Sequence, residues 1–408
     1  MSYSVWQQSV LKGIGTRIEI MAELYPRTYL LLTTVFAVTG YACLLLFPLL
    51  LLTSIAGMYY SLTHSPGVAW LQLLAWMLMA GFCGLLSYRI IQFRPALPAG
   101  VVLDREKMSA LFQLVEDTVE HYACPGIDRI VVTGAYQLDI VSTPRGVVPG
   151  WSTHSLVIGL PLMQCLSPTR FSCLLARRLG QFSKRTNPLV NWLYELRAIW
   201  PRYRDPAVET EFGLLPLRRV FSIYAPLYTT VSTAAARLDE LQADSYAMEL
   251  FGDEEVLDAI TTDTVYRLFL REKYWPAIRK LDARDAAAIT KTHTGMVAVL
   301  HAGLQAHNID QWVENAMSME QSCDDPWPLL ARRLENIGHV HARMDTHMTE
   351  SAAEDYLATF RPELEAALEN LSPPEYPRVQ PWSVRMAGLQ RRVQSAMHGL
   401  AHRRELRN

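Results

Sequence analysis

The stretch Tyr29-Leu-Leu-Leu-Thr-Thr-Val-Phe-Ala-Val-Thr-Gly40 lies near the start of a long segment, residues 28–88, that contains no Asp, Glu, Lys or Arg. A helix needs about 20 apolar residues to cross the hydrocarbon core of a bilayer, so this segment has room for two crossings. A polar break at 60–67, which contains Pro and Gly, divides it into predicted spans at about 29–56 and 68–87. Because the connecting loop is short, we expect a transmembrane helical hairpin.

The charges that flank the two spans predict their orientation. Basic residues lie outside the outer ends of the hairpin, whereas the loop between the spans carries none: Lys12, Arg17 and Arg27 precede it, and Arg89, Arg94, Arg105 and Lys107 follow it. The positive-inside rule then places both termini in the cytosol. The apolar run starts too late and is too long for a cleaved signal peptide. We expect an integral membrane protein, of a bacterial inner membrane because Arg is in excess over Lys, with its soluble part in the cytosol.

The overall composition excludes two classes of protein. The 408 residues are 50% hydrophobic and 19% charged, with a formal net charge of −2. A near-zero charge excludes the basic profile of a dedicated nucleic-acid binder, and the high apolar content excludes a disordered chain. The six cysteines lack CxxC spacing and favour buried free thiols in a reducing compartment. The expected partners are the lipid bilayer and a protein or peptide, and no nucleic acid.

The rest of the chain predicts an α+β fold that is mostly helical, with one small sheet. Three short β-rich runs, 129–133, 139–143 and 155–159, are punctuated by Gly and Pro, and helical periodicity dominates after them. The predicted organisation is an N-terminal cytosolic segment (1–28), the hairpin (29–90), a domain at 97–345, and a helical C-terminal region (346–408). The last of these ends in an arginine-rich tail, which could lie on anionic lipid or dock on its own domain.

Four motifs follow one another along the soluble part. They are Gly159-Leu-Pro-Leu162 with Leu166-Ser167, then Ala176-Arg-Arg-Leu-Gly-Gln-Phe182, then Glu240-Leu-Gln-Ala-Asp244-Ser-Tyr-Ala-Met-Glu-Leu-Phe-Gly252, and finally Asp325-Pro-Trp-Pro-Leu-Leu-Ala-Arg-Arg333. In this order the chain resembles the HtpX-like and CAAX-prenyl-protease-type membrane zinc metallopeptidases. Those enzymes carry a GLPLL…LS approach segment, a helix reading AHELGHF, the pattern ExxADxxAxxLxG, and a THPPLxxRLxxLG segment. The resemblance covers about residues 100–340, and it implies a zincin-like metallopeptidase domain.

The zinc-binding motif itself is replaced in this chain. In HExxH, two histidines one turn apart bind zinc and the Glu activates a water molecule. Those positions are Arg177, Arg178 and Gln181 here, and arginine has no lone pair to offer a metal ion. Of the ligands that the resemblance implies, only Glu240 survives, and Trp327 stands where the family has a histidine. We therefore expect a pseudoprotease with no catalytic residues and no cofactor, with zinc bound only if the family activity survives.

Two alternatives stay open for the arginines at this site. Arg177 or Arg178 could replace the charge of the zinc ion by pairing with Glu240 or Asp244, because a buried unpaired carboxylate is costly. The arginines could equally be drifted residues of a dead site. A relocated metal site is a minor possibility, built from scattered histidines: His293, His301, His307, His339, His341 and His347.

The remaining cleft residues come from the approach segment. By the resemblance, residues 153–159 form an edge strand beside the cleft, so Leu156 and Ile158 join Trp327 and the motif residues as its expected lining. Pairing of a peptide with such a strand needs only backbone groups and could outlive catalysis. A strand fully covered by its neighbours is the alternative.

The leading functional prediction is a membrane-anchored scaffold or regulator that binds protein segments. The alternatives are an active metalloendopeptidase with unusual zinc ligands and a purely structural assembly subunit.

Overall fold

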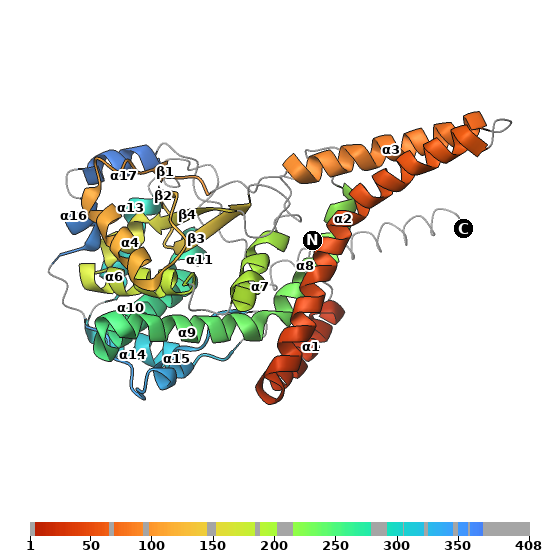
Figure 1. Cartoon of the computed structure of the whole chain (residues 1–408). Helices are drawn as coiled ribbons and strands as arrows, with labels where there is room; N and C mark the ends of the chain where they lie inside the picture. Colours follow the sequence, from red (N-terminus) through yellow and green to blue (C-terminus); the bar gives the residue numbers. More distant parts are fainter. Residues whose placement is uncertain are drawn as a thin grey trace, which may run out of the picture.

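The structure is a computed structural model of the whole chain (Figure 1). It describes residues 5–64, 69–92, 98–144, 152–183, 188–201, 215–278, 292–304, 306–321, 325–345, 350–357 and 360–369. The arginine-rich tail, Cys323 and His347 lie outside the described residues. The other five cysteines are free: Cys43, Cys83, Cys124, Cys165 and Cys173.

Three helices form the N-terminal part of the molecule: α1 (Val5–Leu24), α2 (Pro26–His64) and α3 (Ala69–Gln92). Helix α3 runs beside the C-terminal part of α2, and this pair projects away from the rest of the chain, whereas the N-terminal part of α2 packs on other helices (Figure 1). Both are long and apolar enough to cross a membrane, with mean hydropathies of 2.4 and 1.6. Helix α2 extends beyond the predicted span at each end and continues through Pro48 and into the predicted break, as far as His64.

The small sheet has four strands in the order β1-β2-β4-β3. They are β1 (Val101–Val102), β2 (Arg129–Thr133), β3 (Leu138–Pro144) and β4 (Ser152–Gly159). β4 pairs in parallel with β2 and antiparallel with β3, so the sheet is mixed. The three strands predicted from β-rich runs are thus confirmed, and the short β1 adds a fourth.

The expectation that β4 is an edge strand was wrong, because β4 lies between β2 and β3. Its residues Leu156, Val157 and Ile158 are all buried, as expected for a strand covered on both faces. The edge strand on this side of the sheet is β3. A hydrophobic run of this kind predicts burial but does not identify the neighbouring strands.

A helical layer packs on the sheet and encloses the main core. It contains α4 (Ser109–Tyr122), α5 (Leu160–Cys165), α6 (Pro168–Gly180), α9 (Thr233–Phe251) and α10 (Asp253–Phe269). Ser167 caps the N-terminus of α6, because its hydroxyl accepts a hydrogen bond from the backbone N–H of Arg170. Residues 170–180 of α6 are all buried, because α4, α9, α10 and β3 surround this helix.

Two helices join the soluble part to the N-terminal helices. α7 (Pro188–Ile199) and α8 (Leu215–Val231) pack on α2 through an aromatic cluster that includes Trp200 and Phe221. The hydroxyl of Tyr224 donates a hydrogen bond to the carbonyl oxygen of Phe36 in α2, 2.6 Å away. The α2–α3 hairpin is therefore held against the domain by buried contacts as well as by the chain itself.

The C-terminal half adds short helices around the core. They are the π-helical turn η3 (Leu270–Tyr274), α11 (Trp275–Ile278), α13 (Thr292–Gly303), α14 (Ala306–Met317), α15 (Leu330–Asn336), α16 (Ala352–Leu357) and α17 (Arg361–Glu369). Of these, α15 has the most direct bearing on the site, because it follows Trp327 and carries Arg333.

Candidate functional site

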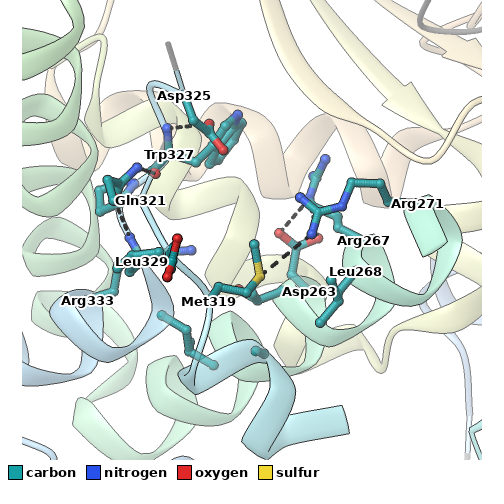
Figure 2. Close-up of a pocket in the computed structure, with 15 residues that line it drawn as sticks. Asp263, Arg267, Leu268, Arg271, Met319, Gln321, Asp325, Trp327, Leu329 and Arg333 are labelled. Carbon is teal, nitrogen blue, oxygen red and sulfur yellow. Dashed lines mark hydrogen bonds and ion pairs between the residues drawn. The ribbon is translucent and has the colours of Figure 1, made fainter. Parts of the chain in front are cut away.

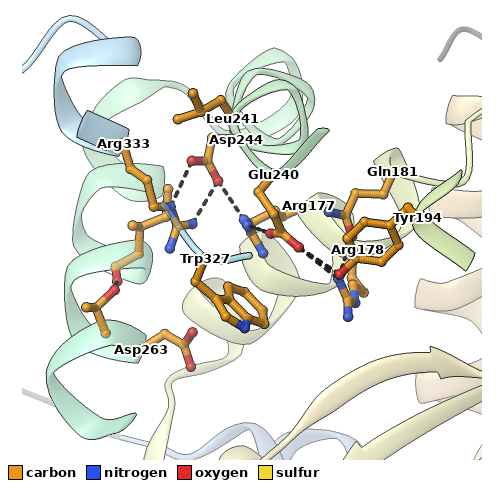
Figure 3. A network of polar contacts seen from close by, with 12 residues as sticks. Arg177, Arg178, Gln181, Tyr194, Glu240, Leu241, Asp244, Asp263, Trp327 and Arg333 are labelled. Atoms are coloured by element: carbon orange, nitrogen blue, oxygen red, sulfur yellow. Dashed lines mark hydrogen bonds and ion pairs between the residues drawn. The ribbon is translucent and has the colours of Figure 1, made fainter. Parts of the chain in front are cut away.

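Helices α6 and α9 bring the two central sequence motifs together in the interior of the domain (Figure 3). They approach closely at Gly180, where a Cβ atom would lie 2.7 Å from the Cβ of Tyr246. Glycine therefore allows the contact between the two helices at this point. The result is that Arg177 and Arg178 of α6 face Glu240 and Asp244 of α9.

The guanidinium group of Arg177 bridges both carboxylates of α9. Its Nε donates to Oδ1 of Asp244 at 2.5 Å, and its Nη2 pairs with Oε2 of Glu240. The side chains of Arg177, Glu240 and Asp244 are only 6%, 1% and 0% exposed. The first of the two alternatives, in which an arginine pairs with these acids, is therefore the one found in the structure.

A second arginine reaches Asp244 from α15. Arg333 donates from Nε to Oδ2 and from Nη2 to Oδ1, at 2.9 and 2.8 Å, in a two-pronged contact. Asp244 is thus held between Arg177 and Arg333 (Figure 3). The motif analysis of the sequence includes Arg333 in the fourth motif but predicts no contact for it.

Arg178 links the α9 carboxylates to the sheet. Its Nη2 pairs with Asp139 of β3, and its Nη1 donates to Oε1 of Gln181 at 2.5 Å and lies 3.4 Å from Oε1 of Glu240. The hydroxyl of Tyr194 in α7 donates to the same Glu240 oxygen at 3.0 Å. The contact with the Gln181 side-chain oxygen thus helps to hold the Arg178 guanidinium in place.

These contacts set the charge of Glu240. Burial by itself raises the pKa of a carboxyl group, but Arg177 and Arg178 outweigh burial here and lower the pKa of Glu240 to about 2. Burial likewise lowers the pKa of the Arg177 guanidinium, and Glu240 and Asp244 outweigh it, so that pKa is raised. Both partners are ionised at neutral pH, and Glu240 is a very weak base.

The indole of Trp327 covers this network. Its ring lies 5.5 Å from the guanidinium carbon of Arg177, 5.9 Å from that of Arg178 and 5.4 Å from that of Arg267 in α10. Two cavities adjoin it. One, of about 160 Å³, is lined by Arg267 and Arg333 among others (Figure 2). The other, of about 410 Å³, lies on the side of Arg178 and β3.

The structure thus brings together six of the eight cleft residues expected from the sequence: Arg177, Arg178, Gln181, Glu240, Asp244 and Trp327. Of these six, Arg178 and Trp327 line a cavity, whereas Arg177, Gln181, Glu240 and Asp244 are buried in the network beside it. Leu156 and Ile158 lie outside the network and line neither cavity, which corrects the expectation that they line the cleft. Both are 0% exposed and belong to the core beneath the sheet. The strand that lines the larger cavity is β3, at Asp139, Ile140, Val141 and Ser142.

The histidines do not assemble into a relocated metal site in the part of the chain that the structure describes. Across those residues, no group of three or more His, Cys, Asp or Glu side chains is placed to hold a metal ion. His339 instead contacts the Asp253 carboxylate at 3.3 Å. The side chains of His293 and His307 lie outside the description.

The zinc ion implied by the family resemblance does not fit the residues at the motif positions. The Arg177 guanidinium contacts both Glu240 and Asp244, so a cation there would meet a fixed positive charge. Neither Arg177 nor Gln181 supplies the imidazole nitrogen that zinc favours. What the arrangement can do is hold permanent charges in a fixed geometry beside a cavity.

Comparison with protein-family models, with curated proteins and with solved structures finds no match to this chain. What the site does is therefore inferred from its own residues and their contacts.

Asp239 is a buried acid that the sequence motifs do not single out. Its side chain is 2% exposed, and neither carboxylate oxygen has a hydrogen-bond partner among the described residues. Burial, together with the neighbouring charge of Glu240, raises its pKa from 3.8 to about 7. Only the fold reveals this residue, because its burial depends on the helices that pack against α9.

The raised pKa of Asp239 predicts a dependence of stability on pH. Between pH 4 and 7 the folded protein keeps a proton that the unfolded chain releases, so this contribution to stability falls as the pH rises. We expect Asp239→Asn to match the parent near pH 4 and to gain up to about 4 kcal/mol by pH 8. Thermal unfolding in detergent at several pH values measures the difference, with the exposed Asp117→Asn as control. An equal gain at every pH would contradict the prediction.

The bridge made by Arg177 predicts strong coupling with Glu240. Arg177→Met leaves buried carboxylates undercompensated and should lower the free energy of unfolding by about 3–5 kcal/mol. Adding Glu240→Gln removes one of those charges, so the double variant should lose less than the sum of the single losses. Chemical denaturation measures each variant. Arg105→Met removes an exposed pair with Glu116 and should cost less than about 1 kcal/mol. Additive losses at Arg177 and Glu240 would refute the coupling.

Proposed function

We propose that this chain is a membrane-anchored pseudoprotease with a zincin-like domain, in which Arg177 takes the place of the zinc ion and the cleft holds an extended protein segment. The observation that carries the proposal is the bridge from Arg177 to Glu240 and Asp244. In an HExxH enzyme with this order of motifs, carboxylates at these positions would face the metal centre. In this chain they are paired with Arg177 instead.

The positions of the motif residues support the zincin-like part of the proposal. Arg177 lies in the last turn of α6 and Gln181 is the C-cap residue of that helix. In the proposal they take the positions of the two HExxH histidines. Glu240 of α9 lies opposite, in contact with Arg177 and close to Arg178. Two helices that meet in this way are the arrangement needed to gather two ligands from one helix and a third from the other.

The edge of the sheet supports the binding of a peptide. Four consecutive residues of β3, Asp139 to Ser142, line the cavity of about 410 Å³. Side chains of a strand alternate between its two faces, so a cavity lined by consecutive residues lies along the strand's edge. An extended segment can add to such an edge through backbone hydrogen bonds, with no metal ion required.

The N-terminal helices support the membrane part. Helices α2 and α3 present large exposed apolar side chains along their length, among them Leu45, Leu52, Leu71 and Leu78. Apolar surface of this extent on a paired helical hairpin fits a lipid environment. We assign the hairpin as the anchor, in a bacterial inner membrane, with the domain in the cytosol as the flanking basic residues predict.

Restoring the metal motif tests the zincin-like arrangement. In the triple variant Arg177→His, Arg178→Glu and Gln181→His, the HExxH ligands face Glu240, so we expect about one zinc ion per purified chain. Elemental analysis by mass spectrometry measures it. The matched control adds Glu240→Gln to the triple variant, which should lose most of the metal.

Two results would contradict the proposal. A folded triple variant that binds no zinc would refute the zincin-like geometry. Stoichiometric zinc in the parent protein, with proteolysis that a chelator abolishes, would establish an active metallopeptidase instead.

Site-specific cross-linking tests the holding of a protein segment. A photoreactive amino acid at Ile140, in the cavity along β3, should form adducts with protein partners when native membranes are irradiated. The same probe at Val340, which is 77% exposed, controls for random collisions. Adducts that are equally abundant at both positions, or absent at Ile140, would count against a peptide-binding cleft.

A further inference from the structure

A second arginine lines the larger cavity and has a contact pattern unlike the others. Arg197 of α7 is half-buried, and it borders the cavity together with Glu195, Tyr194 and β3. All of its hydrogen bonds to the described residues come from Nη1, which donates to the carbonyl oxygen of Thr229 at 2.5 Å and to the hydroxyls of Ser232 and Thr233 at 2.7 and 3.3 Å. Every one of these acceptors is uncharged.

Arg197 therefore lacks the carboxylate that the other cleft arginines have. Within the described part of the chain, Arg177, Arg178 and Arg333 each pair with at least one acid, and Arg197 pairs with none. Burial lowers its pKa, as expected for a cation without a compensating charge. Its Nε and Nη2, the pair of donors that grips a carboxylate from the side, make no hydrogen bond to the described residues.

The backbone of β3 provides a second binding element beside this arginine. The amide of Gly159 donates to the carbonyl oxygen of Gln137 at 2.7 Å. Because hydrogen-bonded pairs alternate along an antiparallel ladder, the backbone groups of Asp139, Val141 and Thr143 face β4. The backbone groups of Leu138, Ile140 and Ser142 point the other way, to the free edge of β3, which no strand among the described residues covers. Two of these residues, Ile140 and Ser142, line the same cavity as Arg197.

The charges of the cavity favour a single carboxylate over a phosphate group. Its lining contains two arginines, Arg178 and Arg197, and two acids, Asp139 and Glu195. Arg178 is already paired with Asp139, and Glu195 accepts a hydrogen bond from the hydroxyl of Ser142. A dianionic phosphate would meet two acids and one available cation, whereas one carboxylate on a peptide matches Arg197 alone.

We infer that Arg197 is an anchor for a carboxylate of the bound segment, either its C-terminus or an acidic side chain, while the backbone of that segment pairs with the free edge of β3. This inference rests on the proposed peptide-binding function and adds the chemistry of the partner to it. The Arg197 fork would bind the carboxylate from the side, and the cavity would take the end of the extended segment.

The test uses the full chain in detergent and fluorescein-labelled peptides of alternating Thr and Val. Each peptide is made with a free C-terminal carboxylate or an amide, and with an internal Glu or Gln. We expect a peptide with either carboxylate to bind the parent protein about 10- to 100-fold more tightly than the amide with Gln, which has neither.

Variants of the protein test whether Arg197 causes this preference. Arg197→Gln should remove the preference, and Arg197→Lys, which keeps the charge but loses the fork, should reduce it. Arg105→Gln, at an exposed arginine, should leave it unchanged. Comparison of the free acid with the internal Glu shows which source of carboxylate the site takes.

The outcomes separate the anchor from the binding function. Ile140→Pro blocks pairing at the free edge without removing a ladder bond, so it should weaken all of the peptides. Suppose that Ile140→Pro weakens binding of all peptides and that the parent protein binds all of them equally well. The peptide-binding function then stands, and the role of Arg197 is refuted. If no peptide binds the parent, both are refuted. Competition by glycerol 3-phosphate but not by acetate would also overturn the carboxylate assignment, in favour of a lipid headgroup. Because the comparison of peptides is made on the parent protein, it does not depend on the folding of a variant.

Discussion

The buried ion network around Arg177 is the constraint on which the interior of this domain depends. Glu240 and Asp244 lie on one turn of α9 with almost no exposure to water, and a buried carboxylate without a partner costs several kcal/mol. Arginines from α6 and α15 supply the compensating charges, so the network fixes three helices relative to one another. Through Arg178 and Asp139 it also fixes the edge strand β3. A shift of α6, α9 or α15 would take a buried charge of this network away from at least one of its partners.

The same network limits the chemistry that the site can perform. An arginine stays protonated at physiological pH, so its carboxylate partners are held as ions and are not freed to take up a proton. Glu240, with a pKa of about 2, is accordingly a poor base. Asp239, which lies outside the ion pairs, has a pKa shifted in the opposite direction. The cavity next to this network is lined by an edge strand and by Arg197, and the proposed peptide binding draws on these two features.

Part of this site can be predicted from residue spacing. The motif on α6 and the motif on α9 are each local patterns on one helix, so the sequence indicates which side chains share a helical face. Pairing of Arg177 with the α9 acids was one of two alternatives, because charge compensation makes it reasonable but local pattern does not place two helices side by side. Arg197 and Asp239 gave no signal in the sequence. Their significance is that, among the described residues, Arg197 pairs with no acid and the Asp239 carboxylate has no hydrogen-bond donor. The absence of a partner is a property of the packed structure.

The amino-acid sequence was sufficient for two apolar helices near the N-terminus and for a mostly helical chain with one small sheet. These follow from composition and from periodicity within single elements, where the physical cause is local. The identity of the edge strand required the tertiary structure, because burial on both faces makes β4 apolar whichever strands lie beside it. The contacts of Arg177, Arg333 and Arg197 also required the tertiary structure, because they join residues that are far apart in the sequence. Which charges are compensated depends on elements far apart in the chain that meet only when it folds.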